Sequence, residues 1–397
     1  MSEHDPPSPA SHAVRLASWL APLTDAFVAT TMLRGTAAGS DQPLSVLVAG
    51  PLSRVQWLVE RAFDGTPRRE PLGHLPAWRL ASMLRRMRGS ADLVVARMAR
   101  VSAARLGFDD DWLPVPDWIG MRLEAPFDLG AIARSNHSVR DDIRRTRRDW
   151  TGEKTHRVED FRTFYRDMYV PFILRRHSDD AYLRSPQRLR RAFRRGGLLW
   201  ALRRGERAAG LLFEKRHRTI AAVAIGVSGG DDAWLRAGAV AALYVHLIEL
   251  ARASDCTSID WRGSRPSLAD GVTRFKRKWG AVVYDRPQVL HTTLLRWDRM
   301  SPAVLAFLEH TPLVFHDVDG LSALVATRAD LAPAPSQAFA RLGIPGLRRL
   351  VLLASSLSVS ERAVDGRCVP LLASAVDAGP RALRAAMRAS IAVGADG

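Results

Sequence analysis

Most of the residues of this chain that could do chemistry lie in residues 259–280. Asp260 ends an apolar run and precedes a turn rich in Gly, Ser and Pro, and loops of this kind often carry binding and catalytic side chains. Its carboxylate could accept a proton from an amine or hydroxyl nucleophile, or it could simply cap the following turn. Glu214 ends another apolar run and is a second candidate base, whose alternative role is an ion pair with Lys215 or Arg216.

A second chemical feature is the basic and aromatic segment 274–279, Arg-Phe-Lys-Arg-Lys-Trp. If Phe275 and Trp279 hold Lys276 in place, its ammonium offers a fixed positive charge for a diphosphate or a developing oxyanion. The alternative is an ordinary lysine on a helix surface. A separate basic group, Arg175-Arg176-His177, could contact an acidic acceptor.

The elements that must position these residues follow from hydrophobic periodicity. In the first half, the pattern predicts strands at 44–48, 93–98 and 118–123 and helices at 55–63 and 78–87. After residue 300 the alternation weakens, and the pattern predicts a strand at 347–355, a helix at 380–391 and a linker at 332–335. Strands alternating with helices indicate an α/β protein.

The pattern is sharpest between residues 138 and 297. It predicts three helices, of which Ser138 caps the first, the second follows Asp160 and bends or stops at Pro171, and the third begins at Ser185-Pro186. There follow three meandering strands, a long helix, a crossover strand and a final strand pair, at 198–202, 208–213, 220–227, 239–253, 257–261, 282–284 and 289–295. This order describes a mixed sheet with helices on its faces.

The charge of the chain restricts its partners. Lys+Arg 58 against Asp+Glu 41 gives a net charge of +17 and a sequence pI near 11.1, and nearly all of the basic residues are arginines. Such a surface favours anionic partners, although a GC-rich genome produces the same arginine bias without selection for binding. Two arginine-rich runs, at 144–148 and 188–195, lie on the polar sides of predicted helices.

Other features set the expected class and compartment. The two cysteines, Cys256 and Cys368, have no metal-ligand spacing, so we expect neither a zinc site nor a disulfide framework. No apolar run approaches the roughly 18 residues of a membrane span, and the first ten residues lack the regions of a signal peptide. We therefore expect a cytoplasmic protein without a metal and without membrane insertion.

The order of elements and four motifs resemble the GNAT acyltransferase superfamily. They look most like its Fem-like branch, which includes acyltransferases associated with polysaccharide and cellulose synthesis. The motifs are Phe161-x-x-Phe164-Tyr165, Gly205-Glu206-x-x-Ala209-Gly210, Ile259-Asp260-x-x-Gly263-Ser264 and Gly271-Val272-x-Arg274-Phe275-Lys276-x-x-Trp279-Gly280. The last is similar to the family's Gly-hydrophobic-x-x-Phe-Lys-x-x-Phe-Gly signature. The likeness covers residues 135–297 by motif and residues 13–134 by architecture.

The resemblance implies a tandem GNAT-like α/β fold, a mixed sheet flanked by helices, with acyl-CoA as co-substrate. It implies a donor cleft where the strand at 223–227 splays from the strand at 258–260. The implied donor-binding residues are Ala224, Ile225, Val227, Arg236, Gly238 and Ala239. The implied acceptor-binding residues are Arg175, Arg176, His177, Arg274, Phe275 and Trp279, and the implied catalytic residues are Asp260, Lys276 and Glu214. The sequence departs from the family's acetyl-CoA loop pattern at Leu235 and Val240, which leaves the donor open.

On this basis we expect a polar leader at 1–12, a first GNAT-like half at 13–134, an acyltransferase domain at 135–300 and an α/β extension at 301–397. The predicted activity transfers an acyl group, acetyl in the first instance, from acyl-CoA to an amine or hydroxyl of a sugar or peptide. Two alternatives stay open. One is a Fem-like transferase that uses aminoacyl-tRNA, for which the arginine-rich helices would be the landing surface. The other is a non-catalytic GNAT-like scaffold that binds an anionic partner.

Overall fold

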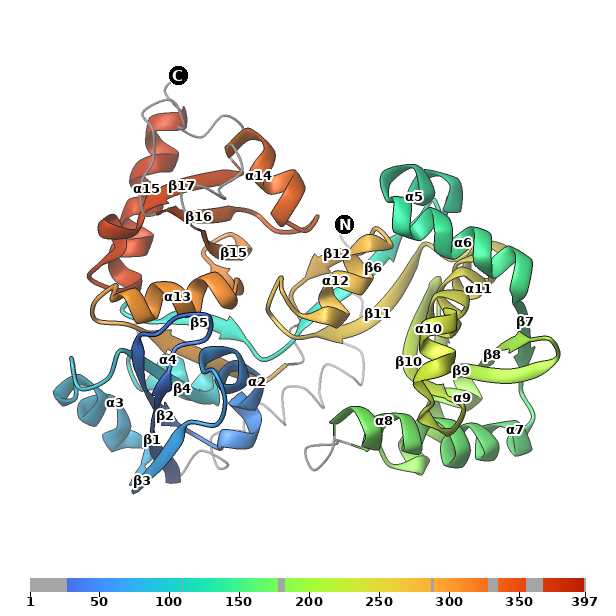
Figure 1. The fold of residues 1–397 in the computed structure, drawn as a ribbon, viewed down its shortest axis with the longest axis horizontal. Coiled ribbons are helices and arrows are strands. Elements are labelled where there is room, and N and C mark those ends of the chain that lie inside the picture. Colours follow the sequence, from blue (N-terminus) through green and yellow to red (C-terminus); the bar gives the residue numbers. More distant parts are fainter. Residues whose placement is uncertain are drawn as a thin grey trace, which may run out of the picture. The chain divides into compact units, whose positions relative to one another are not determined.

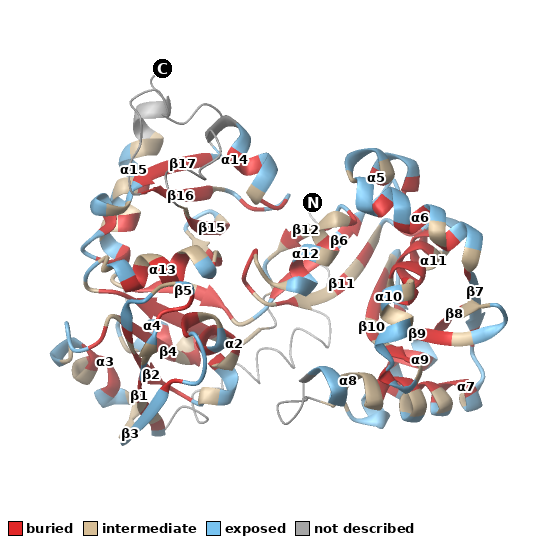
Figure 2. Cartoon of the chain, viewed as in Figure 1, coloured by how far each residue is buried: buried red, intermediate tan, exposed pale blue. Residues whose placement is uncertain are grey.

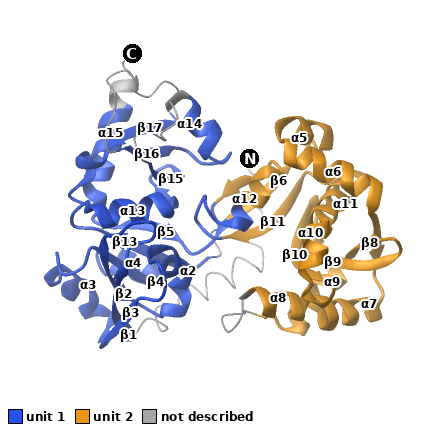
Figure 3. Cartoon of the chain, in the orientation of Figure 1, with its two compact units in different colours: residues 1–119, 265–273, 285–397 blue, residues 120–264, 274–284 orange. Residues whose placement is uncertain are grey.

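The computed structural model describes residues 27–108, 110–177, 183–286, 289–327, 335–354 and 367–395. The chain forms two compact units: unit 1 is residues 1–119, 265–273 and 285–397, and unit 2 is residues 120–264 and 274–284 (Figure 3). No helix in the described residues combines the length and the apolar character that crossing a bilayer requires.

The two units differ from the division predicted from the sequence. The predicted boundary between residues 134 and 135 falls inside unit 2, and the predicted C-terminal extension falls inside unit 1. The reason is the core of unit 1, in which Phe307, Phe315 and Leu353 pack in one cluster with Val46 and Leu58 from the beginning of the chain. The extension therefore completes a core that the N-terminal segment starts.

Unit 2 is built on a seven-stranded mixed sheet in the order β12-β6-β11-β10-β9-β8-β7 (Figure 1). Strands β8, β9 and β10 form an antiparallel meander, and β11 then pairs parallel to β10. The strands are β6 (Ile119–Glu124), β7 (Thr151–Thr155), β8 (Gly196–Arg203), β9 (Glu206–Arg216), β10 (Thr219–Val227), β11 (Ser258–Ser264) and β12 (Val282–Tyr284). The prediction of an α/β fold with mixed sheets flanked by helices is confirmed.

Turn chemistry and burial explain the meander. The β8–β9 turn holds Arg204 and Gly205 at positive φ, 53° and 83°, which the favoured two-residue hairpin turn requires. Strand β9 is buried continuously from Ala208 to Phe213, because helices cover both faces of the sheet there. Figure 2 shows this burial in red along β9 and β10.

The helices of unit 2 cover the sheet from two sides. Helices α7, η2 and α9 share one core cluster with Leu198, Trp200 and Leu212 of the sheet, while α11 packs against β8 and β9. The helices are α5 (Leu129–Ser135), α6 (His137–Asp149), α7 (Val158–Thr163), the π-helical turn η2 (Phe164–Tyr169), α8 (Val170–His177), α9 (Pro186–Arg195), the 3₁₀ turn η4 (Ser228–Gly230), α10 (Asp232–Ala237), α11 (Ala239–Ala253) and α12 (Gly271–Lys278).

The predicted cap of the first helix was wrong, and the second helix does not stop at Pro171. Helix α6 is capped by Asn136, whose side chain accepts the Val139 N–H at 3.3 Å, and not by Ser138. The helix after Asp160 continues through Pro171 to the end of α8. A π-helical turn ends two residues before this proline, so the ordinary i→i−4 ladder is already interrupted near the missing proline N–H.

Unit 1 contains two further sheets, of order β3-β1-β2-β4-β13-β5 and β14-β15-β16-β17. Their strands are β1 (Phe27–Thr36), β2 (Pro43–Ala49), β3 (Arg68–Pro76), β4 (Leu93–Ala99), β5 (Leu113–Pro116), β13 (His291–Arg296), β14 (Leu313–Asp317), β15 (Gly320–Thr327), β16 (Leu350–Ala354) and β17 (Cys368–Leu372). The helices are α2 (Leu52–Ala62), α3 (Ala77–Arg86), α4 (Arg100–Arg105), α13 (Pro302–His310), α14 (Pro335–Leu342) and α15 (Pro380–Ala395), with the 3₁₀ turn η6 (Ala373–Val376).

The predicted strand pair at 282–284 and 289–295 does not form. Strand β12 pairs with β6, whereas β13 pairs with β4 and β5 in the other unit. Sequence proximity suggested a hairpin, but the apolar residues of β13 complete the core of unit 1. Most of the predicted linker at 332–335 lies outside the described residues.

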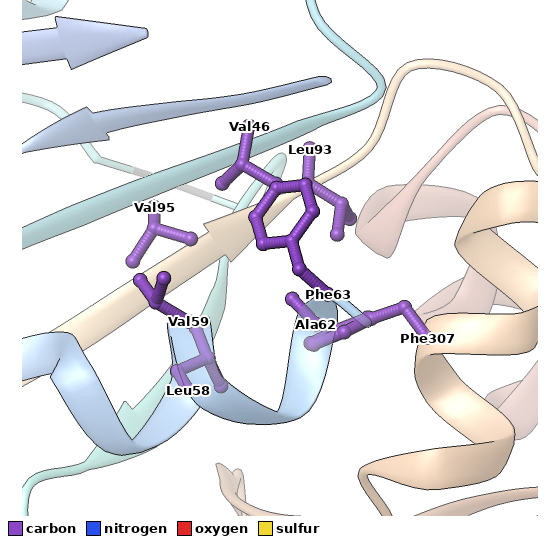
Figure 4. Close-up of a pocket in the computed structure, with 8 residues that line it drawn as sticks. All are labelled: Val46, Leu58, Val59, Ala62, Phe63, Leu93, Val95 and Phe307. Carbon is purple, nitrogen blue, oxygen red and sulfur yellow. The ribbon is translucent and has the colours of Figure 1, made fainter. Parts of the chain in front are cut away.

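The core of unit 1 is tightly packed. A void of about 10 Å³ next to the sheet is lined by apolar side chains from β2, α2, β4 and α13 (Figure 4). An apolar void of this size stays dry and is too small for a ligand. The site residues predicted from the sequence all lie in unit 2.

Four aromatic rings tie α11, β11 and α12 together in unit 2. Tyr244 stacks on Trp261 with ring centroids 3.9 Å apart, and Phe275 and Trp279 approach Tyr244 at 4.9 and 5.7 Å. Burial raises the pKa of Tyr244 above its usual value, so this phenol stays protonated at neutral pH. Trp279 is fully buried, which makes it a core residue and not, in this structure, a surface for the acceptor.

We predict that Trp279→Ala lowers the free energy of unfolding by about 3–5 kcal/mol, because it removes a large buried aromatic side chain. Leu174→Ala is a matched control on exposed α8 and should change stability by less than about 0.5 kcal/mol. Urea unfolding of both variants measures the difference. Equal stability of the two variants would contradict the structural role of Trp279.

Candidate functional site

Strands β10 and β11 separate after a short stretch of pairing. They are paired at Thr219–Ser258, Ile220–Ile259 and Ala221–Asp260, after which β10 continues through 222–227 and β11 through 261–264. In unit 1 the corresponding parallel pair, β2 and β4, stays paired to Ala49, the last residue of β2. The divergence is therefore a property of unit 2, and it lies opposite 261–264, not opposite 258–260 as predicted.

A β-bulge marks β10 at the start of this divergence. The pairing of β10 with β9 shifts register between Ala222 and Ala224, so Val223 has no partner in the ladder. The guanidinium of Arg184 donates a hydrogen bond to the Val223 carbonyl. Bulges often occur next to active sites, where they redirect backbone groups.

Asp260 is the last residue of β11 that pairs with β10, and it is partly exposed. Its Oδ1 accepts the backbone N–H of Arg262 at 2.8 Å and the Tyr284 hydroxyl at 3.0 Å. Its Oδ2 lies 3.5 Å from the guanidinium of Arg262. The carboxylate thus caps the following turn, as the simpler prediction held, and it also accepts a hydrogen bond from β12.

Glu214 lies level with Asp260 in the sheet, two strands away. The register places Glu214, Ala221 and Asp260 side by side on β9, β10 and β11. Glu214 is only 3% exposed, and its carboxylate pairs with Arg195 at 2.9 Å, with Arg216 and with Arg262 at 3.5 Å. This burial and pairing identify Glu214 as an anchor for arginines, a role that the sequence prediction with Arg216 anticipated.

Arg262 connects the two carboxylates of this row. Its guanidinium lies 3.5 Å from both Glu214 and Asp260, and its backbone adopts a left-handed conformation with φ of 63°. Non-glycine residues rarely adopt this conformation, and they often do so at functional sites. The Asp260 carboxylate stabilises it here by accepting the Arg262 N–H.

Lys276 is buried under the end of β11. Its ammonium donates to the carbonyls of Arg262 at 3.3 Å and Gly263 at 2.8 Å, and to Ser264 Oγ at 3.0 Å. These acceptors match the three donors of an ammonium group. Lys276 is only 5% exposed, so it holds the chain that follows Asp260 and does not face a substrate in this structure.

The start of α11 lies against the basic side chain of Arg145. Gly238 has φ of 96°, and a Cβ at this position would lie about 3 Å from the guanidinium of Arg145. Arg145 and Lys278 both pair with the buried Asp142. A helix N-terminus carries partial positive charge, so this corner of unit 2 is suited to an anionic group.

The other predicted residues occupy varied environments. Ala224 and Val227 are buried in β10 and Ile225 is half-buried; Ala239 is buried at the start of α11, whereas Arg236 is exposed on α10. Arg175 donates to the Gly230 carbonyl at 3.3 Å, Arg176 lies over Phe172, and both are exposed on α8. Arg274 is exposed on α12. The side chain of His177 lies outside the described part of the structure.

Sequence reasoning missed Gly120, Tyr284 and Arg262, and it named Arg145 only as part of an arginine-rich run. Gly120 and Tyr284 lie more than 130 residues apart in the chain but face each other on β6 and β12. A short strand such as β12 gives little periodic signal, so nothing in the sequence linked it to Asp260. Arg262 lies inside a recognised motif, but its left-handed backbone is visible only in the structure.

The chain matches no protein-family model, and no curated protein matches it. Among solved structures it is similar to FemX, at 11% identity over 70% of this chain and 90% of that one, with a TM-score of 0.36. It is also similar to L-PGS from Bacillus licheniformis, at 12% identity over 78% and 98% of the two chains, with a TM-score of 0.34.

A third similar structure is a GCN5-related N-acetyltransferase from Sphaerobacter thermophilus. The identity is 16% over 64% of this chain and 72% of that one, and the TM-score is 0.32. At these identities and scores the likeness assigns no activity to the chain. The names of these three proteins do not mention polysaccharide or cellulose synthesis, so that part of the resemblance stays a prediction.

We predict that Lys276→Met lowers the free energy of unfolding by about 1–3 kcal/mol, because it leaves buried acceptors of β11 unsatisfied. Arg274→Met on the exposed side of the same helix is the matched control and should change stability by less than about 0.5 kcal/mol. Denaturant unfolding measures both. A fully stable Lys276→Met protein would instead favour direct contact of this lysine with a substrate.

Proposed function

We propose that the chain is an acyltransferase whose donor enters between the diverging ends of β10 and β11. The observation that carries this proposal is the early end of β10–β11 pairing at Ala221–Asp260. It ends the ladder between two adjacent strands next to a partly exposed carboxylate. The bulge at Val223 would aim backbone groups at a thioester carbonyl, where developing negative charge can be stabilised.

In this proposal the donor is an acyl-CoA. The thioester arm lies along Ala224, Ile225 and Val227, and the diphosphate lies near the start of α11. Gly238 and Ala239 let an anion approach backbone N–H groups there. Arg145 lies beside Gly238, Lys278 shares its partner Asp142, and the exposed Arg236 comes two residues before Gly238, which supports an anionic donor.

The acceptor is an amine or a hydroxyl of a sugar or peptide. Asp260 accepts its proton while the nucleophile attacks the thioester carbon, and both substrates are bound at once, so that the reaction is effectively intramolecular. Arg175 and Arg176 of α8 and Arg274 of α12 are the proposed contacts for an acidic group of the acceptor. Lys276 and Glu214 keep structural roles, the first under β11 and the second among three arginines.

We predict that acetyl-CoA raises the melting temperature of the protein saturably, because a ligand that binds only the folded state stabilises it by about 2.7 kcal/mol at 100 times its Kd. Asp260→Asn should keep this shift and should lower transfer to glucosamine or to a lysine dipeptide by about 10²–10⁴-fold. Release of CoA, detected with a thiol reagent, measures the transfer.

Asp255→Asn is the control, since Asp255 has an exposed side chain in unit 2, and it should leave both quantities unchanged. If acetyl-CoA, longer acyl-CoAs and free CoA all fail to shift the melting temperature, the acyl-CoA donor is excluded. If Asp260→Asn retains full transfer, the assignment of the base is wrong.

A second candidate donor is aminoacyl-tRNA, favoured by the basic surface of unit 2. Helix α6 presents an open face formed by Arg144, Arg145 and Arg148, each of which pairs with an aspartate of the same helix. Helix α9 adds a second exposed basic face, formed by Arg188, Arg190, Arg191, Arg194 and Arg195. Arginine-rich helices of this kind bind phosphate backbones in a salt-dependent way.

We predict for this alternative that binding of charged tRNA weakens by about 10³–10⁵-fold between 50 and 200 mM salt. The double variant Arg144→Gln/Arg148→Gln should weaken binding at low salt and flatten the salt dependence. The control is Arg85→Gln/Arg86→Gln on α3 of unit 1, where both side chains are exposed. Absent binding, or equal losses in the two double variants, would rule out α6 as a tRNA surface.

A further inference from the structure

The two oxygens of the Asp260 carboxylate lie in different environments. Oδ1 accepts two short hydrogen bonds, one from the Arg262 backbone at 2.8 Å and one from the Tyr284 hydroxyl at 3.0 Å. Oδ2 has a single contact among the described residues, the Arg262 guanidinium at 3.5 Å. The oxygen with spare acceptor capacity is therefore Oδ2.

Tyr284 reaches Asp260 by crossing a neighbouring strand. The sheet order places β6 between β12 and β11, and Tyr284 pairs with Gly120 of β6. A Cβ on Gly120 would overlap the ring carbons of Tyr284. The phenol ring thus lies across the glycine, and any side chain at position 120 would push it away.

Backbone conformation does not explain this glycine. Gly120 is absent from the described residues with positive φ, so other residues could adopt its extended backbone. The requirement is spatial: a residue without a side chain leaves room for the ring. Gly120 and Tyr284 thus act together on a third residue, Asp260, although none of the three is adjacent to another in sequence.

The hydrogen bond of Tyr284 has a definite effect on the carboxylate. The terminal torsion of an aspartate side chain is broad, so the Arg262 N–H alone holds one oxygen but leaves the carboxylate plane free to turn. A second donor to the same oxygen restricts this rotation. Because Oδ1 accepts two hydrogen bonds, the orientation of Oδ2 is restricted as well.

We propose that Gly120 and Tyr284 are positioning residues that orient Asp260 so that its Oδ2 takes the proton of the acceptor. This inference rests on the acyl transfer proposed above. In that step the acceptor N–H or O–H bond breaks and its proton passes to Oδ2. The nucleophile bonds to the acyl carbon, the C–S bond breaks, and the thiolate leaves with the electron pair and is protonated from Asp260 or solvent.

The geometric part is tested by NMR on protein labelled with ¹³C at tyrosine Cζ. The sequence has five tyrosines, and Tyr284→Phe identifies the signal of Tyr284 by its loss. Asp260→Asn and Gly120→Ala should both shift that signal, since each changes the hydrogen bond of the phenol. Gly271→Ala is the matched control, because a Cβ there meets no atom within 4 Å, and it should leave the signal unchanged.

The catalytic part is tested by kinetics with acetyl-CoA and glucosamine. Tyr284→Phe removes only the hydroxyl and should lower kcat by about 10–100-fold with an unchanged KM for acetyl-CoA, as expected when a catalytic group is slightly misplaced. Gly120→Ala should have a similar effect. In a Tyr284→Ala background, Gly120→Ala should lower kcat no further, because the effects of two residues that act through one contact are not additive.

Two results would overturn the inference. If the Tyr284 signal keeps its chemical shift in both Asp260→Asn and Gly120→Ala, the contact does not exist in solution, whatever the activity. Unchanged kcat in Tyr284→Phe would show that the contact does not position a base. If the wild type transfers to no acceptor probe, the proposed function and the proton-transfer step fail together, while the NMR result still decides whether Tyr284 and Gly120 orient Asp260.

Discussion

The site depends on the hydrogen bonds between the Lys276 ammonium and the end of β11. Beyond Asp260, β11 has lost β10 as a partner, and its backbone carbonyls need other donors. Successive carbonyls of a regular strand point in opposite directions, yet those of Arg262 and Gly263 both reach one ammonium. The left-handed backbone of Arg262 makes this possible. One buried lysine thus stabilises the divergence of the strands and the unusual turn together.

The surroundings of Asp260 and Glu214 give the two carboxylates different roles, which the sequence alone could not distinguish. Glu214 is buried among Arg195, Arg216 and Arg262, and removal of a partner from such a pair leaves an uncompensated charge. Asp260 shares only Arg262 with it and stays partly exposed. Two carboxylates in one row of a sheet can therefore have different roles because their surroundings differ.

Sequence reasoning predicted the meander, the long helix α11 and the crossover to β11, because each has a strong apolar period and clear turn residues. It also selected Asp260 and Lys276, which the structure brings together through the end of β11. It could not predict the burial of Lys276, since a lysine in a basic run resembles a surface residue. The short strand β12 and the glycine of β6 depend on pairing between distant segments, which one sequence does not display.

The division of the chain also bears on its synthesis. Helix α12 crosses the unit boundary, with Thr273 in unit 1 and Arg274 in unit 2. Unit 2 needs no residue beyond Tyr284, whereas unit 1 needs strands from both ends of the chain. Domains tend to fold as units while the ribosome elongates the chain. The inserted unit 2, with its buried lysine and aromatic rings, can therefore fold before β13 has been synthesised. Strands β1, β2 and β4 of unit 1 lack this partner strand until then.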